Sequence, residues 1–163
     1  MTILTIETEL KGKNKILRAT SKEVKDIKSP GVQKLVRDMH KTLAATEHGI
    51  GLAAPQVGAN VRIFVASPAL GLNQTVFINP IILKISNKTE QIEEGCLSLP
   101  GLYGKIARAT SLKVQAQNQN GRIFKMKAEG LIAQLIQHEI GHLDGELFKD
   151  KAQELFPVNK EKK

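Results

Sequence analysis

The stretch His138-Glu139-Ile140-Gly141-His142 decides how the rest of the chain is interpreted. Its two histidines are four residues apart, and in an α-helix this spacing returns to nearly the same face about 6 Å further along the axis. Both imidazoles can therefore reach one metal ion, with Glu139 beside them as a general base toward metal-bound water. A helix with two partly exposed histidines is the competing interpretation of the motif alone, so the remaining sequence has to decide.

The patterns around this stretch predict a chain of short strands and two helices. A helix is expected from Glu129 to about Gly145, with one face formed by Leu131, Leu135, His138 and His142. A second helix is expected after the N-cap pair Ser29-Pro30. Alternating or β-branched segments predict strands at Thr2 to Glu7, Val61 to Ser67, Val76 to Ile85, Thr89 to Glu94, Tyr103 to Arg108, Leu112 to Gln117 and Arg122 to Ala128. The last two form a hairpin across the turn signal Asn120-Gly121.

Length and composition limit the number of domains and the class of protein that this chain can form. With 163 residues, 41% of them hydrophobic, the chain is expected to form a single domain over 1–163. Residues 1–28 are expected to be irregular apart from an edge strand, and residues 146–163 to form a short polar tail with Leu147, Phe148, Leu155 and Phe156 able to dock. No apolar run approaches the roughly 20 residues that span a bilayer, and the N-terminus lacks a secretory pattern, so a cytoplasmic protein without membrane contact is expected.

The net charge of +8 raises the question of an anionic partner. Ten of the 24 basic residues fall between Lys11 and Lys41, and others lie at Lys160, Lys162 and Lys163. Acidic residues interrupt this pattern, aromatic residues make up only 4%, and no motif for sequence-specific nucleic-acid binding is present. An ordinary solvated surface is favoured, with loose attraction to an RNA-rich partner as the alternative.

The segment from Gly49 to Gly58 combines glycines, small residues and a proline, which disfavour both a helix and a central strand. An irregular loop that another molecule can approach closely is expected, against the plainer alternative of a helix-to-strand connector. The neutral amide of Gln56 inside this apolar loop could donate to a developing oxyanion without adding a competing charge.

A catalytic metal site of this kind needs about three protein ligands and an open position. The extended motif with a third histidine is excluded because Phe148 stands at that place, and Glu146, Glu154 and Glu161 lie in or near the tail, without a second helix to present them. The single cysteine, Cys96, is the better candidate, since a metal would hold it as a thiolate. The alternative, a Cys96 nucleophile paired with a histidine, leaves Glu139 without a role.

Three stretches in one order resemble the peptide deformylases, the enzymes that remove the formyl group from the starting methionine of new chains. They are G-I-G-L-A-A-P-Q at 49–56, E-G-C-L-S-L at 94–99 and Q-H-E-I-G-H-L-D-G at 137–145, and the resemblance covers about Ile27 to Phe148. It implies an α+β fold, with antiparallel β-sheets packed around a central helix that carries both histidines and a second helix on the N-terminal side.

The resemblance also implies roles for particular residues. Cys96, His138 and His142 would ligate the metal, and Glu139 would take a proton from metal-bound water and deliver it to the leaving amine. Gln56, the backbone N–H of Leu97 and the metal would meet the oxyanion. The extended substrate would pair with backbone near Ile50, Gly51 and Gly95, and the methionine pocket would draw on Ile50, Ile92, Leu131, Leu135 and Gln134.

The family resemblance implies one divalent ion, Fe(2+) natively, with Zn(2+) or Ni(2+) able to occupy the same site. Formylmethionyl nascent peptides are the expected partners, with loose ribosome association as a further one, and the protein is expected to be a monomer. Family members most often carry aspartate where this chain has Gly141. A glycine inside a helix costs about 1 kcal/mol relative to alanine, and the missing carboxylate is expected to leave a basic neighbour unpaired, with activity retained.

Two rival functions remain at this point. A zinc peptidase would use the same helix to cleave internal peptide bonds in unformylated substrates. A catalytically weak or inactive deformylase-like protein that docks on the ribosome would keep the fold without turnover. The presence of Gln56, Cys96, His138, Glu139 and His142 together argues against the second rival.

Overall fold

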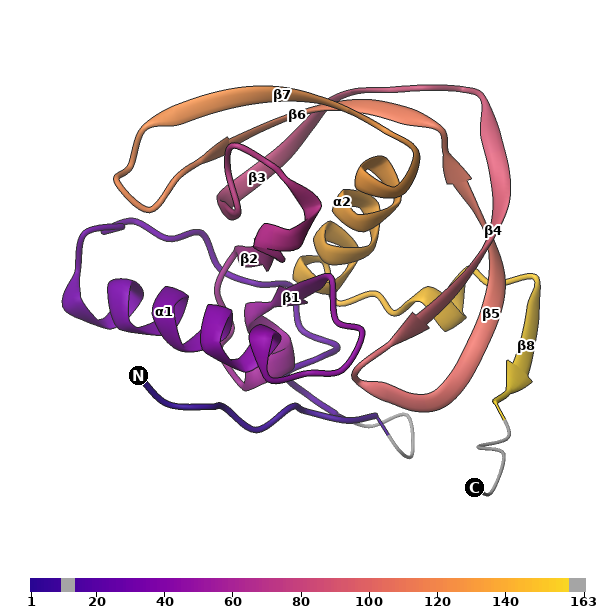
Figure 1. The fold of residues 1–163 in the computed structure, drawn as a ribbon, viewed down its shortest axis with the longest axis horizontal. Coiled ribbons are helices and arrows are strands. Elements are labelled where there is room, and N and C mark those ends of the chain that lie inside the picture. Colours follow the sequence, from indigo (N-terminus) through magenta and orange to yellow (C-terminus); the bar gives the residue numbers. More distant parts are fainter. Residues whose placement is uncertain (10–13, 159–163) are drawn as a thin grey trace.

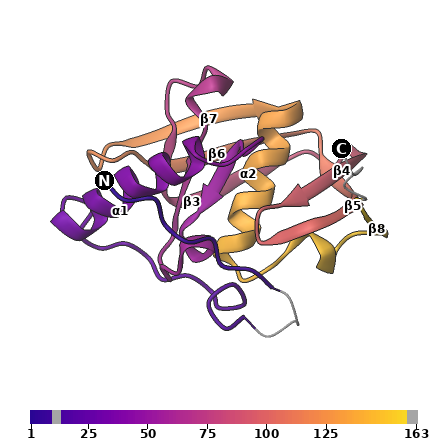
Figure 2. The same cartoon turned by 60° about the horizontal axis from the view of Figure 1, so that its bottom comes forward.

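The computed structural model describes residues 1–9 and 14–158 (Figures 1 and 2). It contains two α-helices, α1 (Pro30–Ala44) and α2 (Gly130–Leu143), and eight strands in two sheets. The larger sheet has the order β1-β2-β3-β6-β7, with strands Gly51–Ala53, Ile63–Ala66, Val76–Ile85, Ser111–Gln117 and Ile123–Glu129. The smaller sheet has the order β4-β5-β8, with strands Thr89–Cys96, Leu99–Ala109 and Glu154–Pro157. All named strand pairs are antiparallel, as expected.

The two helices pack on opposite faces of the larger sheet. Helix α2 packs on one face through a cluster that includes Phe64, Phe77, Val114, Ile136 and Ile140. Helix α1 packs on the other face, over β1 to β3, through a cluster that includes Val36, Met39, Leu52, Ile63 and Ile78. A third cluster lies beneath the β4–β5 hairpin and contains Leu99, Ile106, Leu147 and Phe148. Helix α2 therefore lies between the two sheets (Figure 1).

The helix boundaries follow the sequence signals. The Ser29 hydroxyl accepts a hydrogen bond from the Val32 N–H at 3.4 Å, and Pro30 occupies the first helical position. Helix α2 follows its N-cap residue Glu129 and ends at Leu143. Gly145 then adopts a left-handed conformation with φ of 77°, where glycine carries no Cβ penalty. Both predicted helices are thus confirmed.

The prediction for the N-terminal end is wrong, and the prediction for the C-terminal end is incomplete. Thr2 to Glu7 forms no strand, because the backbone N–H groups of Thr2 and Leu4 donate to Asp38 and Thr42 side chains on α1 instead of to a sheet. Leu147 and Phe148 dock in the core as expected, but Glu154–Pro157 also forms β8 and pairs with β5, which was not predicted. Part of the basic surface expected from the sequence lies outside the described residues, namely Lys11, Lys13, Lys160, Lys162 and Lys163.

The segment expected to be an irregular loop contains short regular pieces. Residues Gly51–Ala53 form β1 at the edge of the larger sheet, and Ala54–Val57 form a 3₁₀ turn. The expected exclusion of a central strand is confirmed, but a three-residue edge strand tolerates glycine at one end. Strand β5 is also longer than predicted and begins at Leu99, because the β4–β5 turn at Leu97 and Ser98 is tight. In the part of the chain that the structure describes, no helix has the length and apolar character to cross a bilayer.

Candidate metal and catalytic site

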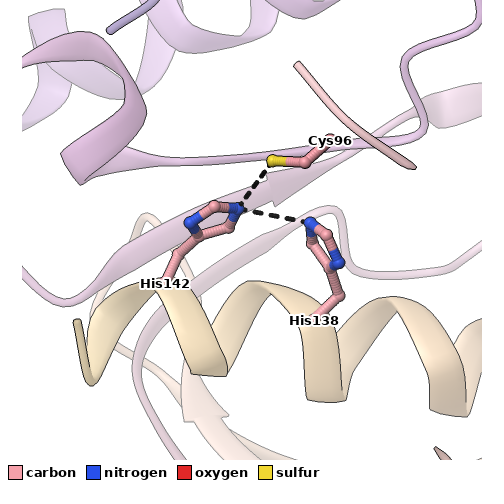
Figure 3. Close-up of side chains that lie close together, drawn as sticks. All are labelled: Cys96, His138 and His142. Atoms are coloured by element: carbon pink, nitrogen blue, oxygen red, sulfur yellow. Dashed lines mark hydrogen bonds between the residues drawn. The ribbon is translucent and has the colours of Figure 1, made fainter. Parts of the chain in front are cut away.

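Three potential metal ligands converge between α2 and the end of β4 (Figure 3). The Nε2 atom of His142 lies 3.2 Å from the Cys96 sulfur and 3.2 Å from Nε2 of His138. All three ligand atoms lie within 4.8 Å of one another. Figure 3 shows both imidazoles rising from one face of α2 toward the thiol, as the four-residue spacing predicts.

The donor set fits a divalent transition metal. Sulfur and imidazole nitrogen are ligands that zinc and iron accept, and three protein ligands leave a position for water. Burial, together with the neighbouring His138, lowers the pKa of His142 well below its usual value, so this imidazole is neutral with a free lone pair. Two ring nitrogens that face each other at 3.2 Å share at most one proton, whereas a cation between them and the sulfur satisfies all three donors.

A carboxylate and a guanidinium orient His138 from behind. The Nδ1 atom of His138 lies 2.8 Å from a carboxylate oxygen of Glu94. Arg108 donates two hydrogen bonds to the same carboxylate, at 2.7 and 2.9 Å. Burial alone would raise the pKa of Glu94, but the hydrogen bonds from Arg108 and His138 outweigh it and lower the pKa to about 2. A charged Glu94 therefore accepts from Nδ1 and directs Nε2 of His138 toward the cluster. Burial alone would lower the pKa of His138, but its contacts with Cys96 and Glu94 raise it well above the usual value, so Nε2 would give up a proton when a metal binds.

Glu139 is buried beside the cluster, at 3% exposure. One of its carboxylate oxygens, Oε2, has no hydrogen-bond partner among the described residues. Burial raises the pKa of Glu139, His138 opposes this rise and the Glu94 charge adds to it, and together they bring the pKa to about 7. A carboxylate with a pKa near neutrality can both accept and return a proton at physiological pH.

Gly51 leaves the space that the Glu139 carboxylate occupies. A Cβ added at Gly51 would lie 2.6 Å from Oε1 of Glu139 and 2.4 Å from a methyl group of Leu135. The first residue of β1 thus approaches α2 more closely than any side chain allows. This is the close backbone approach that the glycine-rich segment predicts.

Gln56 joins the 3₁₀ turn to the cysteine. Its side-chain oxygen accepts from the Ala53 N–H at 2.9 Å, and its amide nitrogen donates to the Ser98 hydroxyl at 3.2 Å and lies 3.5 Å from the Cys96 sulfur. The side chain is 2% exposed and fixed at both ends. The amide N–H groups therefore point toward the cluster, as the oxyanion hypothesis requires.

A cleft of about 490 Å³ opens onto this group. Its lining includes most of the predicted site residues: Ile50, Gly51, Gln56, Gly95, Cys96, Leu97, Leu131, Gln134, Leu135, His138 and Glu139. Strand β1 is an edge strand that borders the cleft, so its outer side is available to an extended peptide. Ile92 does not line the cleft and packs instead in the cluster with Leu99 and Ile106.

The sequence of this chain was compared with those of known proteins. The family model for polypeptide deformylase matches residues 6–157. The chain belongs to the polypeptide deformylase family. It is 46% identical over 127 residues to peptide deformylase 1 of Bacillus anthracis, covering 77% of this chain and 80% of the relative. It is 45% identical over 137 residues to peptide deformylase 1 of Clostridium perfringens, covering 84% and 91%.

Solved deformylase structures share the fold. The peptide deformylase of Thermotoga maritima matches with a TM-score of 0.86 and 36% identity, over 94% of this chain and 99% of that one. The Synechococcus elongatus enzyme, solved in complex with actinonin, matches with a TM-score of 0.82 and 37% identity, over 92% and 79%. These matches confirm the predicted α+β deformylase fold and the assignment to a family of hydrolases.

Three residues around this site cannot be identified from the sequence. Glu94 stands in a sequence motif that assigns it no role, and the strand pattern from Tyr103 to Arg108 says nothing about the Arg108 side chain. Their pairing depends on the β4–β5 register, in which Glu94 lies opposite Gly104 and Arg108 lies four residues further along β5. No spacing rule in a single sequence gives that register. Ser98, which holds Gln56, was likewise not singled out.

At the end of α2, Arg62 has a partner although residue 141 is a glycine. A Cβ added there would meet only the Cβ of Glu146, at 4.0 Å. Arg62 reaches the C-terminal end of the helix and pairs with Asp144 at 2.8 Å. Because Asp144 supplies a carboxylate three residues beyond Gly141, the expected unpaired charge does not arise at Arg62.

Proposed function

We propose that this chain is a metal-dependent hydrolase that removes the N-formyl group from the formylmethionine of nascent polypeptides and releases formate. The observation that carries the proposal is the position of the buried Glu139 carboxylate beside the Cys96, His138 and His142 cluster, at the base of a cleft. A buried base next to an open three-ligand site is the arrangement needed to hydrolyse an amide.

Cys96, His138 and His142 would hold one divalent ion, natively Fe(2+), with Zn(2+) or Ni(2+) also able to bind this donor set. When bound, the ion supplies Lewis acidity that activates water at neutral pH and polarises the formyl oxygen. Glu94 and Arg108 keep the His138 ring in the required orientation and tautomer.

Glu139 handles the proton. Its unpartnered Oε2 accepts a proton from the attacking water, and the carboxylic acid then donates that proton to the departing amine nitrogen. The pKa of about 7 suits both steps. Gly51 contributes by leaving the carboxylate its place.

The developing oxyanion would be stabilised by the side-chain amide of Gln56 and the backbone N–H of Leu97. A neutral amide adds stabilisation without attracting a second anion. Because Ala53 and Ser98 fix the amide on both sides, its orientation needs no reorganisation during the reaction.

The substrate would bind as an extra strand along the edge of β1. Backbone groups near Ile50, Gly51 and Gly95 would pair with the peptide, so residues after methionine are read weakly. The methionine side chain would lie on Leu131 and Leu135, with Gln134 beside them. Ile92, which packs behind the hairpin, would support this pocket from a distance.

Formylmethionyl nascent peptides are the partners in this proposal, and the protein would act as a monomer in the cytoplasm, in loose association with ribosomes. No sequence-specific nucleic-acid binding and no membrane contact are part of the proposal.

The test is formate release from formyl-Met-Ala-Ser by anaerobically purified, Fe(2+)-loaded protein, measured with a coupled formate dehydrogenase. Glu139→Gln should abolish release while metal content stays the same, and Glu23→Gln, an exposed glutamate far from the motif, serves as the matched control. Release by Glu139→Gln at the parent rate would overturn the role of Glu139. Cleavage of internal bonds in unformylated peptides would instead support the zinc peptidase.

A further inference from the structure

A row of lysines crosses three adjacent strands of the larger sheet. Lys84 of β3 lies opposite Lys113 of β6, and Lys113 lies opposite Lys127 of β7. Directly paired residues in an antiparallel sheet project from the same face, and adjacent strands are about 4.8 Å apart. Lys125 precedes Lys127 by two residues and therefore projects from that face as well. Four lysines thus share a small area, which we call the lysine array.

The lysine array faces outward. The residues that alternate with it, Leu112, Val114 and Ala128, are buried in the cluster around α2 on the opposite side of the sheet. Helix α1 covers the outward side only over β1 to β3, so β6 and β7 form an open margin of the molecule (Figure 1).

The array is not neutralised by the described part of the chain. None of its four lysines forms a salt bridge or side-chain hydrogen bond with the residues that the structure describes. One carboxylate, Glu129, shares the face two residues beyond Lys127, opposite Ser111. Four positive charges therefore stand against one negative charge.

Without a bound anion, the lysine array lowers the stability of the folded protein. Like charges directly opposite on neighbouring strands are destabilising, by roughly 0.2–1 kcal/mol for each pair. By contrast, the exposed Lys34 on α1 is paired with Asp38 in the same molecule. A ligand with closely spaced negative charges would convert the unfavourable row into a favourable one.

We propose that the lysine array binds the phosphate backbone of double-helical RNA. A duplex carries one negative charge per about 1.7 Å of its axis, so several phosphates lie within reach of lysines that are about 4.8 Å apart across strands and about 6.7 Å apart along β7. Single-stranded RNA is less suited, because bases are usually held by aromatic side chains. The outward positions around the array are Ile81, Ser111, Gln115, Gln117 and Ile123, and none is aromatic.

This inference lies beyond the proposed hydrolase activity and does not depend on it. The array is carried by β3, β6 and β7, whereas the cleft is lined by residues before β2, around β4 and β5, and on α2. Contacts to phosphate alone read no sequence, so the binding is independent of base identity.

The test is fluorescence anisotropy of a labelled 16-base-pair RNA duplex with the full chain, at 50 and 200 mM KCl. The informative variant is Lys113→Gln with Lys127→Gln. The matched control is Lys25→Gln with Lys28→Gln, which removes two exposed lysines elsewhere and lowers the net charge equally.

With four phosphate contacts, the parent should lose about 150-fold in affinity between the two salt concentrations, and the array variant with two contacts about 12-fold. The control should behave as the parent does. The array variant should keep its formate release and should melt at or slightly above the parent temperature, because it removes two like-charge pairs, and this separates the binding role from loss of folding and from catalysis.

Three results would overturn the proposal: equal weakening in the array and control variants, absence of duplex binding at 50 mM KCl, or tighter array-dependent binding to another anion. Vesicles containing phosphatidylserine test the last case, since Ile81 and Ile123 are exposed beside the array. A 12-nucleotide single strand bound more tightly than the duplex would likewise contradict it.

Discussion

The replacement Gly51→Ala tests the geometry around the carboxylate of Glu139, the proposed general base, directly. The added methyl would lie 2.6 Å from Oε1 of Glu139, about 0.8 Å inside the 3.4 Å at which ordinary van der Waals contact begins. It would also lie 2.4 Å from a methyl of Leu135. Both neighbours are ends of flexible side chains, so the fold can adjust, and the carboxylate has to move by nearly 1 Å.

A misplacement of about 1 Å at a catalytic group costs on the order of 10²-fold in rate, or about 2.7 kcal/mol in the barrier. We therefore expect kcat for formate release to fall about 100-fold in Gly51→Ala. Metal content should remain at the parent value. The atoms nearest to the new methyl belong to Leu135 and Glu139, and none belongs to Cys96, His138 or His142.

The matched control is Gly31→Ala, since an added Cβ at Gly31 in the first turn of α1 meets no atom within 4 Å. This control should keep parent kcat and gain slightly in thermal stability. A Gly51→Ala protein with kcat within twofold of the parent would refute the idea that the close approach of β1 positions Glu139. A loss of bound metal equal to the loss of rate would assign the effect to the cluster instead.

Three further changes probe the surroundings of the site. Arg108→Met should weaken metal binding by about 10- to 100-fold in a competition titration with a chelator, because Glu94 loses both charge-assisted hydrogen bonds and orients His138 less well; unchanged affinity would contradict this. Gly141→Ala should raise the melting temperature by about 2–4 °C, since the site is open and glycine costs about 1 kcal/mol in a helix, and Gly141→Asp should raise it less; a lower value in calorimetry would disprove it. The hydrogen bond from Arg18 outweighs burial and lowers the pKa of Asp150, so its contribution to stability is present above the normal pKa near 3.8 and is lost as pH falls through the lower folded value. Asp150→Asn should therefore flatten the acid limb of a stability–pH curve, and a parallel curve would count against it.

The sequence predicts well wherever local chemistry decides the structure. Ser29 and Pro30 start α1 because capping and fixed φ act within one turn. The pair His138 and His142 is placed on one face of α2 by helix geometry alone. The hairpin of β6 and β7 follows from alternation and a turn signal.

The sequence fails where a distant partner competes for the same backbone groups. Thr2 to Glu7 alternates as a strand does, yet the N–H groups of Thr2 and Leu4 are taken by side chains of α1. Leu155 and Phe156 were expected only to dock, yet their backbone completes the smaller sheet beside Tyr103. Neither outcome can be derived from propensity, because each depends on which edge the folded core leaves open.

The candidate metal site shows the same contrast between local chemistry, which the sequence reveals, and long-range pairing, which it does not. The candidate ligands can be predicted from the sequence, because cysteine and a pair of histidines four residues apart are recognisable metal-binding residues. The hydrogen bonds that orient His138 cannot be predicted in this way, because they depend on the cross-strand register. Glu94 reaches His138 on one side and Arg108 on the other only because β4 and β5 pair with this register. A shift of one residue would turn Arg108 to the other face of the hairpin and leave a buried carboxylate without its guanidinium. The register of the hairpin that carries the candidate ligand Cys96 therefore controls the tautomer of the candidate ligand His138 on a different element, and this coupling exists only in the folded protein.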